Sequence, residues 1–131
     1  MLKVEVVSPE SVAYAGEAEM VIARTVGGGD IAFQPGHVSF IGTLAVWSVD
    51  VVKPDGTRDS FAVHRGFVQV SADTITILSD VSESASDIDT ARATEARDQA
   101  RAALAGGEDD DAAAALTRAD LRLRVAGVEP G

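Results

Sequence analysis

Apolar and polar residues alternate along the first two thirds of the chain, with the two-residue period of half-buried β-strands. The pattern is clearest at the N-terminus, where Leu2, Val4 and Val6 alternate with Lys3 and Glu5. Successive side chains of a strand point to opposite faces, so this pattern predicts a strand with one buried face.

Similar segments follow, separated by turn-forming residues. A glycine-rich turn at 27–30, a Pro-Gly turn at 34–37 and a Pro-Asp-Gly turn at 54–56 each interrupt an apolar run. We also expect Gly16 to break the chain. The strands whose bounds the pattern indicates cover residues 2–7, 11–15, 17–26, 30–33, 47–51, 60–64, 67–71 and 74–79. About nine or ten short strands with closely spaced turns predict an all-β sandwich or flattened barrel over residues 1–85.

The period changes at Ser86, where alanine and charged residues become frequent. Ser86 or Asp87 is suited to cap a helix, with Asp89 in its first turn, where negative charge favours the helix dipole. We expect this helix to end near Ala105, because Gly106 and Gly107 follow.

A second helix is predicted after the acidic link 108–111, which also supplies its cap. An apolar stripe then runs at spacings of four and three through Ala112, Leu116, Ala119, Leu123 and Ala126. Two helices joined by a short loop form an antiparallel hairpin, here residues 86–131. Alanine buries little apolar area, so we expect the hairpin to be held weakly.

Composition narrows the classes of function. The formal charge of −10 argues against a nucleic-acid partner, because phosphate binding depends on clustered Lys and Arg. The absence of cysteine fits a reducing cytoplasm. No run reaches the roughly 18 to 20 apolar residues that cross a bilayer, and Met1–Val7 does not resemble a signal peptide. The chain is expected to be soluble, in contact with a membrane only through a larger complex.

Candidate catalytic chemistry is sparse. The histidines are His37 and His64, without the spacing of a catalytic triad or a metal site. The glycines at 27–29 lack the Gly-Lys-Ser/Thr of a P-loop, and the acidic run at 108–111 lacks the spacing of an EF-hand. These features predict a protein without catalytic residues or a metal site.

Three sequence words, in order, resemble a known family. They are "GGDIAFQPGHVSFIGTL" at 28–44, "RGFVQVSADTITILSD" at 65–80 and "IDTARA" at 88–93. The first is similar to a Gly-Glu-Leu-Gly-Ile-x-Pro-Gly-His run, the second to Gly-Gly-Phe-x-x-Val ending in Val-Leu-Ala-Asp, and the third to Ile/Leu-Asp-x-x-Arg-Ala. Together they resemble the epsilon subunit of F-type ATP synthases, the counterpart of the mitochondrial delta subunit.

The resemblance implies a non-catalytic rotor subunit at the foot of the central stalk of a proton-translocating ATP synthase. The sandwich would bind the gamma subunit and the c-subunit ring, as a peripheral protein on the cytoplasmic face of the bacterial plasma membrane. The family's c-ring turn corresponds here to Gly28, Gly29, Asp30 and Ile31. Its gamma-facing histidine corresponds to His37, and Trp47 is a second candidate for contact with gamma.

Four positions differ from the family pattern: Ala32, Ser39, Arg65 and Trp47. Ala32, Arg65 and Trp47 stand where glycine is usual, and Ser39 stands where proline is usual. A glycine at position 47 could have supplied a positive φ, so the tryptophan is expected to alter the local turn or to fill an apolar surface that gamma covers.

In the family the helical hairpin has two states. Extended, it reaches the alpha/beta catalytic head and blocks ATP hydrolysis; folded, it binds a regulatory ATP in some members. The matching positions here are Ile88, Asp89, Arg92, Ala93, Arg118 and Arg122. Asp89 and Arg92 would equally form an ordinary surface pair. No cofactor is required for the rotor function, and the alternative function is a free-standing ATP-sensing module of the same fold.

Overall fold

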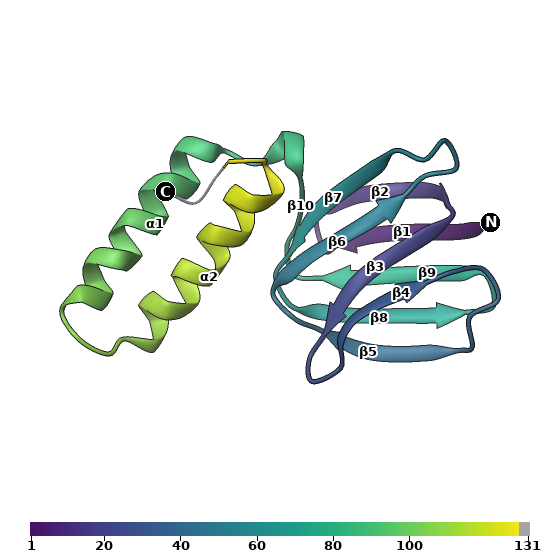
Figure 1. The fold of residues 1–131 in the computed structure, drawn as a ribbon, viewed down its shortest axis with the longest axis horizontal. Helices are drawn as coiled ribbons and strands as arrows, with labels where there is room; N and C mark the ends of the chain where they lie inside the picture. The colour runs from purple at the N-terminus through teal and green to yellow at the C-terminus, as the bar shows by residue number, and fades with distance from the viewer. Residues whose placement is uncertain (129–131) are drawn as a thin grey trace. The chain divides into compact units, whose positions relative to one another are not determined.

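The computed structural model describes residues 1–128. The chain divides into two compact units, Met1–Ser84 and a second that begins at Ala85. The first is built from strands and the second from helices (Figure 1). This confirms the predicted fold class, a β-sandwich followed by a two-helix hairpin.

The first unit contains ten strands within the described residues. They are β1 (Leu2–Ser8), β2 (Ser11–Ala18), β3 (Met20–Thr25), β4 (Gly29–Phe33), β5 (Phe40–Leu44), β6 (Trp47–Val52), β7 (Arg58–Val63), β8 (Gly66–Ser71), β9 (Thr74–Ser79) and β10 (Ser82–Ser84). Their hydrogen-bonded order is β10-β7-β6-β3-β5-β8-β9-β1-β2, with β4 paired to β3.

These strands form two layers that pack face to face, with β3, β6 and β7 crossing over β1, β8 and β9 (Figure 1). A single register pair, Thr25 with Leu44, joins β3 to β5 where the layers meet. The strands pair antiparallel, except that β1 runs parallel to β9.

The core lies between the layers and is formed by the inward residue of each alternating pair. In β1, Leu2, Val4 and Val6 are buried while Lys3 and Glu5 are exposed, as the sequence predicts. Phe33 and Phe61 are the largest fully buried side chains, within a cluster otherwise made of Val, Ile, Leu and Ala. The core is therefore small and aliphatic, in keeping with the low aromatic content.

Two strand boundaries differ from the prediction. The break expected at Gly16 is wrong, because β2 continues through Gly16, which pairs with Val4 of β1. The chain turns instead near Glu19, so the single strand expected over 17–26 is divided between β2 and β3. A glycine in an edge strand keeps its ladder hydrogen bonds, which explains why it does not act as a breaker here.

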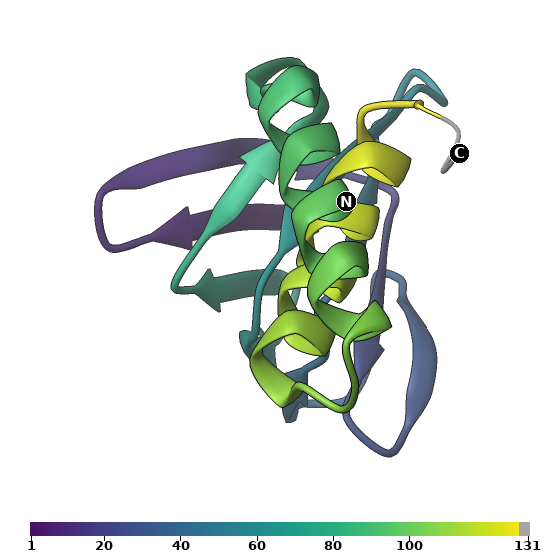
Figure 2. The same cartoon turned by 90° about the vertical axis from the view of Figure 1, so that its left-hand side faces the viewer.

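The second unit consists of a 3₁₀ turn (Ala85–Asp87), α1 (Thr90–Ala105) and α2 (Asp110–Val125). Figure 2 shows α1 and α2 side by side, and the two helices contact each other along their lengths. The predicted cap at Ser86 or Asp87 is wrong: both residues lie in the 3₁₀ turn, and Asp89 is the N-cap, accepting from the backbone N–H of Arg92 at 3.1 Å.

The end of the first helix and the start of the second agree with the sequence. α1 stops at Ala105, before Gly106 and Gly107, and Asp109 of the acidic link caps α2 by accepting from the backbone N–H of Ala112. Of the predicted stripe, Ala112, Ala119 and Leu123 are buried and Leu116 and Ala126 are half-buried. Leu121 is also buried, although it lies off that stripe.

Candidate functional site

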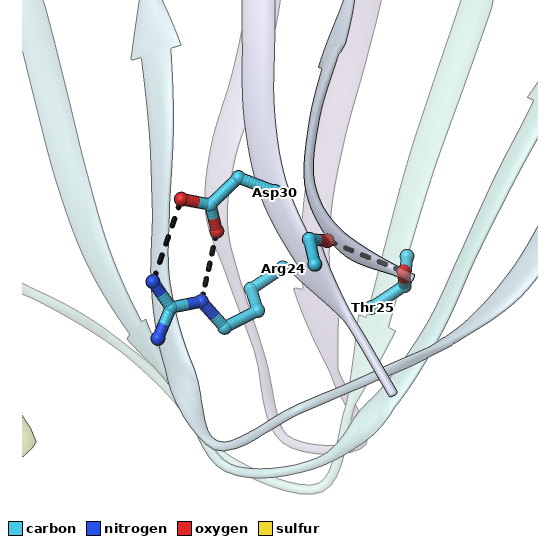
Figure 3. A network of polar contacts seen from close by, with 4 residues as sticks. Arg24, Thr25 and Asp30 are labelled. Carbon is cyan, nitrogen blue, oxygen red and sulfur yellow. Dashed lines mark hydrogen bonds and ion pairs between the residues drawn. The ribbon is translucent and has the colours of Figure 1, made fainter. Parts of the chain in front are cut away.

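The predicted c-ring turn forms the tip of the β3–β4 hairpin. Residues 26–28 connect the strands, and Gly27 and Gly29 have positive φ values of 79° and 70°, which glycine adopts without a steric penalty. The Thr25 hydroxyl donates to the carbonyl of Gly29 at 3.3 Å and ties the two sides together (Figure 3). Ile31 of β4 packs against the core, whereas Asp30 and Val26 are exposed to solvent at this turn.

Asp30 is already engaged within the chain. Directly across the β3–β4 ladder, Arg24 donates from Nε to Oδ1 of Asp30 at 2.8 Å and from Nη2 to Oδ2 at 3.4 Å (Figure 3). The central carbon of the Arg24 guanidinium lies 3.7 Å from the centroid of the ring of Trp47, the first residue of β6. Strands β4, β3 and β6 thus contribute one residue each to a stacked cluster, which we call the Arg24 cluster: Arg24, Asp30 and Trp47.

The electrostatics of the Arg24 cluster follow from this geometry. The hydrogen bond to Asp30 raises the pKa of Arg24 above its ordinary value, although partial burial opposes the shift. The side chains remain 38% and 52% exposed, for Arg24 and Asp30 respectively, so water screens the pair. The turn therefore presents a carboxylate whose charge is partly compensated, rather than a free negative charge.

His37, the candidate for contact with gamma, occupies the turn between β4 and β5. Its ring meets Phe33 edge-on at a centroid distance of 5.0 Å and lies near Phe40, and its Nδ1 donates to the carbonyl of Val38 at 2.7 Å. Val38 itself is 76% exposed. These contacts fix the half-buried imidazole ring beside an exposed apolar side chain.

An apolar row crosses the outer face of the layer that contains β8, β9, β1 and β2. Phe67 pairs with Leu78, Leu78 with Val7, and Val7 with Val12 in the strand registers. Phe67 and Leu78 are 54% and 47% exposed. We call these four residues the outer apolar row.

A groove of about 470 Å³ runs beside this row. Its lining includes Val7, Phe67 and Leu78, with Arg65 and Asp80 as its charged residues. An apolar groove with a few charges at its edge is typical of a protein-binding surface. Exposed Ile41 of β5 lies on the same outer face, opposite Gln69 of β8.

The structure distinguishes two of the departures from the family pattern. Trp47 does not have a positive φ, so the β5–β6 connection accommodates it without left-handed backbone. Arg65 does have a positive φ, of 68°, at a position where the resemblance implies glycine. The unusual residue at position 47 therefore affects side-chain contacts, whereas the one at position 65 affects the backbone.

The nucleotide candidates all lie in the helical unit. Asp89 is the N-cap of α1, Ile88 before it and Ala93 after it are buried, and Arg92 is exposed on the first turn. Arg118 and Arg122 lie one turn apart in the second half of α2. Because the helices run antiparallel, both groups lie at the same end of the hairpin. Whether they bind ATP stays a prediction.

Within residues 1–128, no group of three or more His, Asp or Glu side chains is placed to hold a metal ion, and no helix is long and apolar enough to cross a membrane. The second histidine, His64, is buried at the end of the β7 ladder, and its Nε2 lies 3.1 Å from Oε1 of Glu83 in β10. This pair fastens the last strand of the sandwich to its neighbour.

Sequence reasoning missed Arg24 and the outer apolar row. Arg24 could have been found by pairing residues across the glycine turn, since positions 24 and 30 are equidistant from position 27. The outer row could have been found from Phe67 and Leu78, which occupy outward positions of strands whose inward residues are Val68, Val70, Ile75 and Ile77.

Comparison with known proteins relates both units to one family. Residues 1–85 match the family model of the β-sandwich domain of the ATP synthase delta/epsilon chain. The ATP synthase epsilon chain of Streptomyces griseus is 37% identical over 127 residues, covering 97% of this chain and 96% of that protein. The epsilon chain of Thermobifida fusca is 44% identical over 130 residues, covering 95% and 85%.

Solved structures share the fold. A chain of the Euglena gracilis mitochondrial ATP synthase, from its OSCP/F1/c-ring assembly, superposes with a TM-score of 0.71 at 18% identity, covering 96% of this chain and 77% of that one. A chain of the Tetrahymena thermophila mitochondrial central stalk and c-ring gives a TM-score of 0.55 at 14% identity, covering 66% and 69%. With a sandwich that matches the family model and epsilon-chain relatives that extend through the helical hairpin, this protein belongs to the ATP synthase delta/epsilon chain family.

Proposed function

We propose that this chain is the non-catalytic rotor subunit that joins the gamma subunit to the c-subunit ring of a proton-translocating ATP synthase. The observation that carries the proposal is the similarity to epsilon chains over nearly the whole length, sandwich and hairpin together. In this role the sandwich transmits rotation as a rigid body, which its continuous ladder and apolar core allow.

The two surfaces of the sandwich suit different partners. The outer apolar row, with the adjacent groove, offers an apolar contact area of the kind that a stably associated subunit covers, and we assign it to gamma. The glycine tip presents the Asp30 carboxylate, which suits a polar loop, and we assign it to the c-ring. The hairpin is assigned the regulatory role, reaching the alpha/beta head when it is extended.

Co-purification tests the assignment to gamma. We expect the full chain to be retained by tagged gamma and Phe67→Asp to lower its affinity more than tenfold, because a carboxylate would be buried in the contact without a partner. Ser71→Asp is the matched control: it lies exposed at the far end of the same strand and should bind as the wild type does. A wild-type chain that binds neither gamma nor the c-ring would contradict the rotor assignment and favour a free-standing module.

A further inference from the structure

Trp47 is the sole tryptophan of the chain, and the buried core does not use it. It lies outside the hydrophobic cluster between the layers and is only half-buried. The guanidinium carbon of Arg24 lies over its ring, 3.7 Å from the ring centroid. The ring therefore acts on the surface of the sandwich, beside the β3–β4 tip.

Stacking on Trp47 restricts the motion of the exposed ion pair between Arg24 and Asp30. An arginine side chain at a surface usually samples many rotamers, and an exposed pair with aspartate gains little from Coulomb attraction. A planar guanidinium held against a tryptophan face loses that freedom in the free chain, and the attraction between cation and ring favours a single orientation. Since Arg24 contacts both oxygens of Asp30, the carboxylate is fixed with it.

The carboxylate is accessible to a second donor. An ionised carboxylate has about four lone-pair positions and can accept several hydrogen bonds at once. Asp30 is 52% exposed, so a partner can reach it from solvent. An incoming cation would find an acceptor that is already ordered, without the entropy loss that immobilising a free side chain requires.

We propose that Trp47 is a positioning residue which, by stacking on Arg24, holds the Asp30 carboxylate ready for a cationic side chain of the c-ring loop. This inference rests on the proposed function, because the rotor assignment supplies the partner. It assigns Trp47 to the c-ring side of the sandwich instead of the gamma side.

Fluorescence of the free chain tests the stack without any partner. Trp47 is the only tryptophan, so its quenching by acrylamide reports on this site alone. We expect Arg24→Ala to raise the quenching rate constant of Trp47, because the guanidinium covers one face of the ring. Unchanged quenching in a variant with wild-type circular dichroism would overturn the stack and the proposal with it.

Binding to the ring tests the consequence. The full chain and its variants are titrated against a detergent-solubilised gamma–c-ring complex. We expect Trp47→Gly to weaken binding about two- to fivefold and Trp47→Phe to retain most of the affinity, because phenylalanine keeps an aromatic face for Arg24. In an Asp30→Asn background, Trp47→Gly should cost nothing further, since there is no carboxylate left to position.

Two results would overturn the proposal while leaving the rotor assignment in place. One is wild-type affinity for Trp47→Gly. The other is a loss that stays as large in the Asp30→Asn background, which would mean that Trp47 contacts the partner or supports the fold independently of Asp30. Failure of the wild-type chain to bind the complex at all would instead contradict the proposed function itself.

Discussion

The carboxylate of Asp89 caps α1 by accepting from the backbone N–H of Arg92 at 3.1 Å. This contact involves the main chain of Arg92 and leaves its guanidinium exposed. Asp89→Ala should therefore destabilise α1 by about 1 kcal/mol, and Asp89→Asn should retain the cap. Hydrogen exchange of the α1 amides measures the effect. Asp109→Ala, which removes the corresponding cap of α2, should give a similar loss confined to α2.

Gly66 is the glycine whose replacement should disturb the sandwich most. With φ of 148°, a Cβ at this position would overlap the carbonyl oxygen of Leu78 in β9. Gly66→Ala should cost about 3 kcal/mol or more, measured by urea denaturation. Gly56→Ala is the control, because Gly56 has a φ of 85° with open space around it and should show only the smaller cost of left-handed backbone. Equal losses would show that the clash with β9 is relieved by movement.

Arg65 carries backbone strain that a glycine would remove. Its φ of 68° lies in the left-handed region, which costs a residue with a side chain about 1 kcal/mol. Arg65→Gly should therefore be more stable than Arg65→Ala by about 0.5–1 kcal/mol in urea denaturation, even though glycine loses more entropy on folding. The alanine variant removes the same guanidinium, so the comparison isolates the backbone. Equal stabilities would mean that the turn relaxes around alanine.

Asp55 makes stability depend on pH in the β6–β7 turn. Its Oδ1 accepts from the hydroxyl of Thr57 at 2.6 Å and from the backbone N–H of Thr57 at 2.9 Å. The hydroxyl bond and then the backbone bond lower the pKa of Asp55 below its ordinary value. The ionised carboxylate therefore favours the folded state above the unfolded pKa, near 4, and this contribution is lost as pH falls through the lower folded pKa. Compared with Asp55→Asn, the wild type should lose its relative stability below about pH 4 in urea titrations.

ATP binding by the hairpin is testable on the isolated full chain by calorimetry. If the matching motif is functional, ATP should release heat that Arg92→Ala combined with Arg122→Ala abolishes, because convergent guanidinium groups would hold the triphosphate. Arg101→Ala, farther along α1, should leave the heat unchanged. The absence of heat in the wild type, or heat that persists in the double variant, would exclude this site.

Alternation and turn chemistry were sufficient to predict most of the sandwich. The two-residue alternation predicts the strands around Val49, Val68 and Ile77, because one face of each strand is buried against the other layer. β5 and β10 were not predicted. In β5 the exposed Ile41 is followed by Gly42, which has no side chain to continue the alternation. β10 has three polar or charged residues, and it is a strand because it pairs with β7. Such pairings lie in the tertiary structure and leave no local pattern.

The candidate sites, like the strands, were only partly predictable from the sequence. Resemblance located Asp30 and Trp47 in the sequence, but their connection through Arg24 requires three strands to lie side by side. The sequence places the cap of α1 two to three residues too early, because Ser86, Asp87 and Asp89 can all cap a helix. The backbone at Asp89, with φ of −79° and ψ of 99°, decides among them. Local composition identifies the set of possible caps, and the fold selects one.

The parallel pairing of β1 with β9 has a consequence for synthesis of the chain. β1 is made first, yet its partner strand, Thr74–Ser79, is made more than sixty residues later. During translation β1 can pair with β2 first. Its other edge has no hydrogen-bonded partner strand until β9, which includes Leu78, has left the ribosome. One of the last strands of the sandwich thus completes the pairing of the first, so a nascent chain that stalls before β9 exposes the unpaired backbone N–H and C=O groups of β1 to other chains.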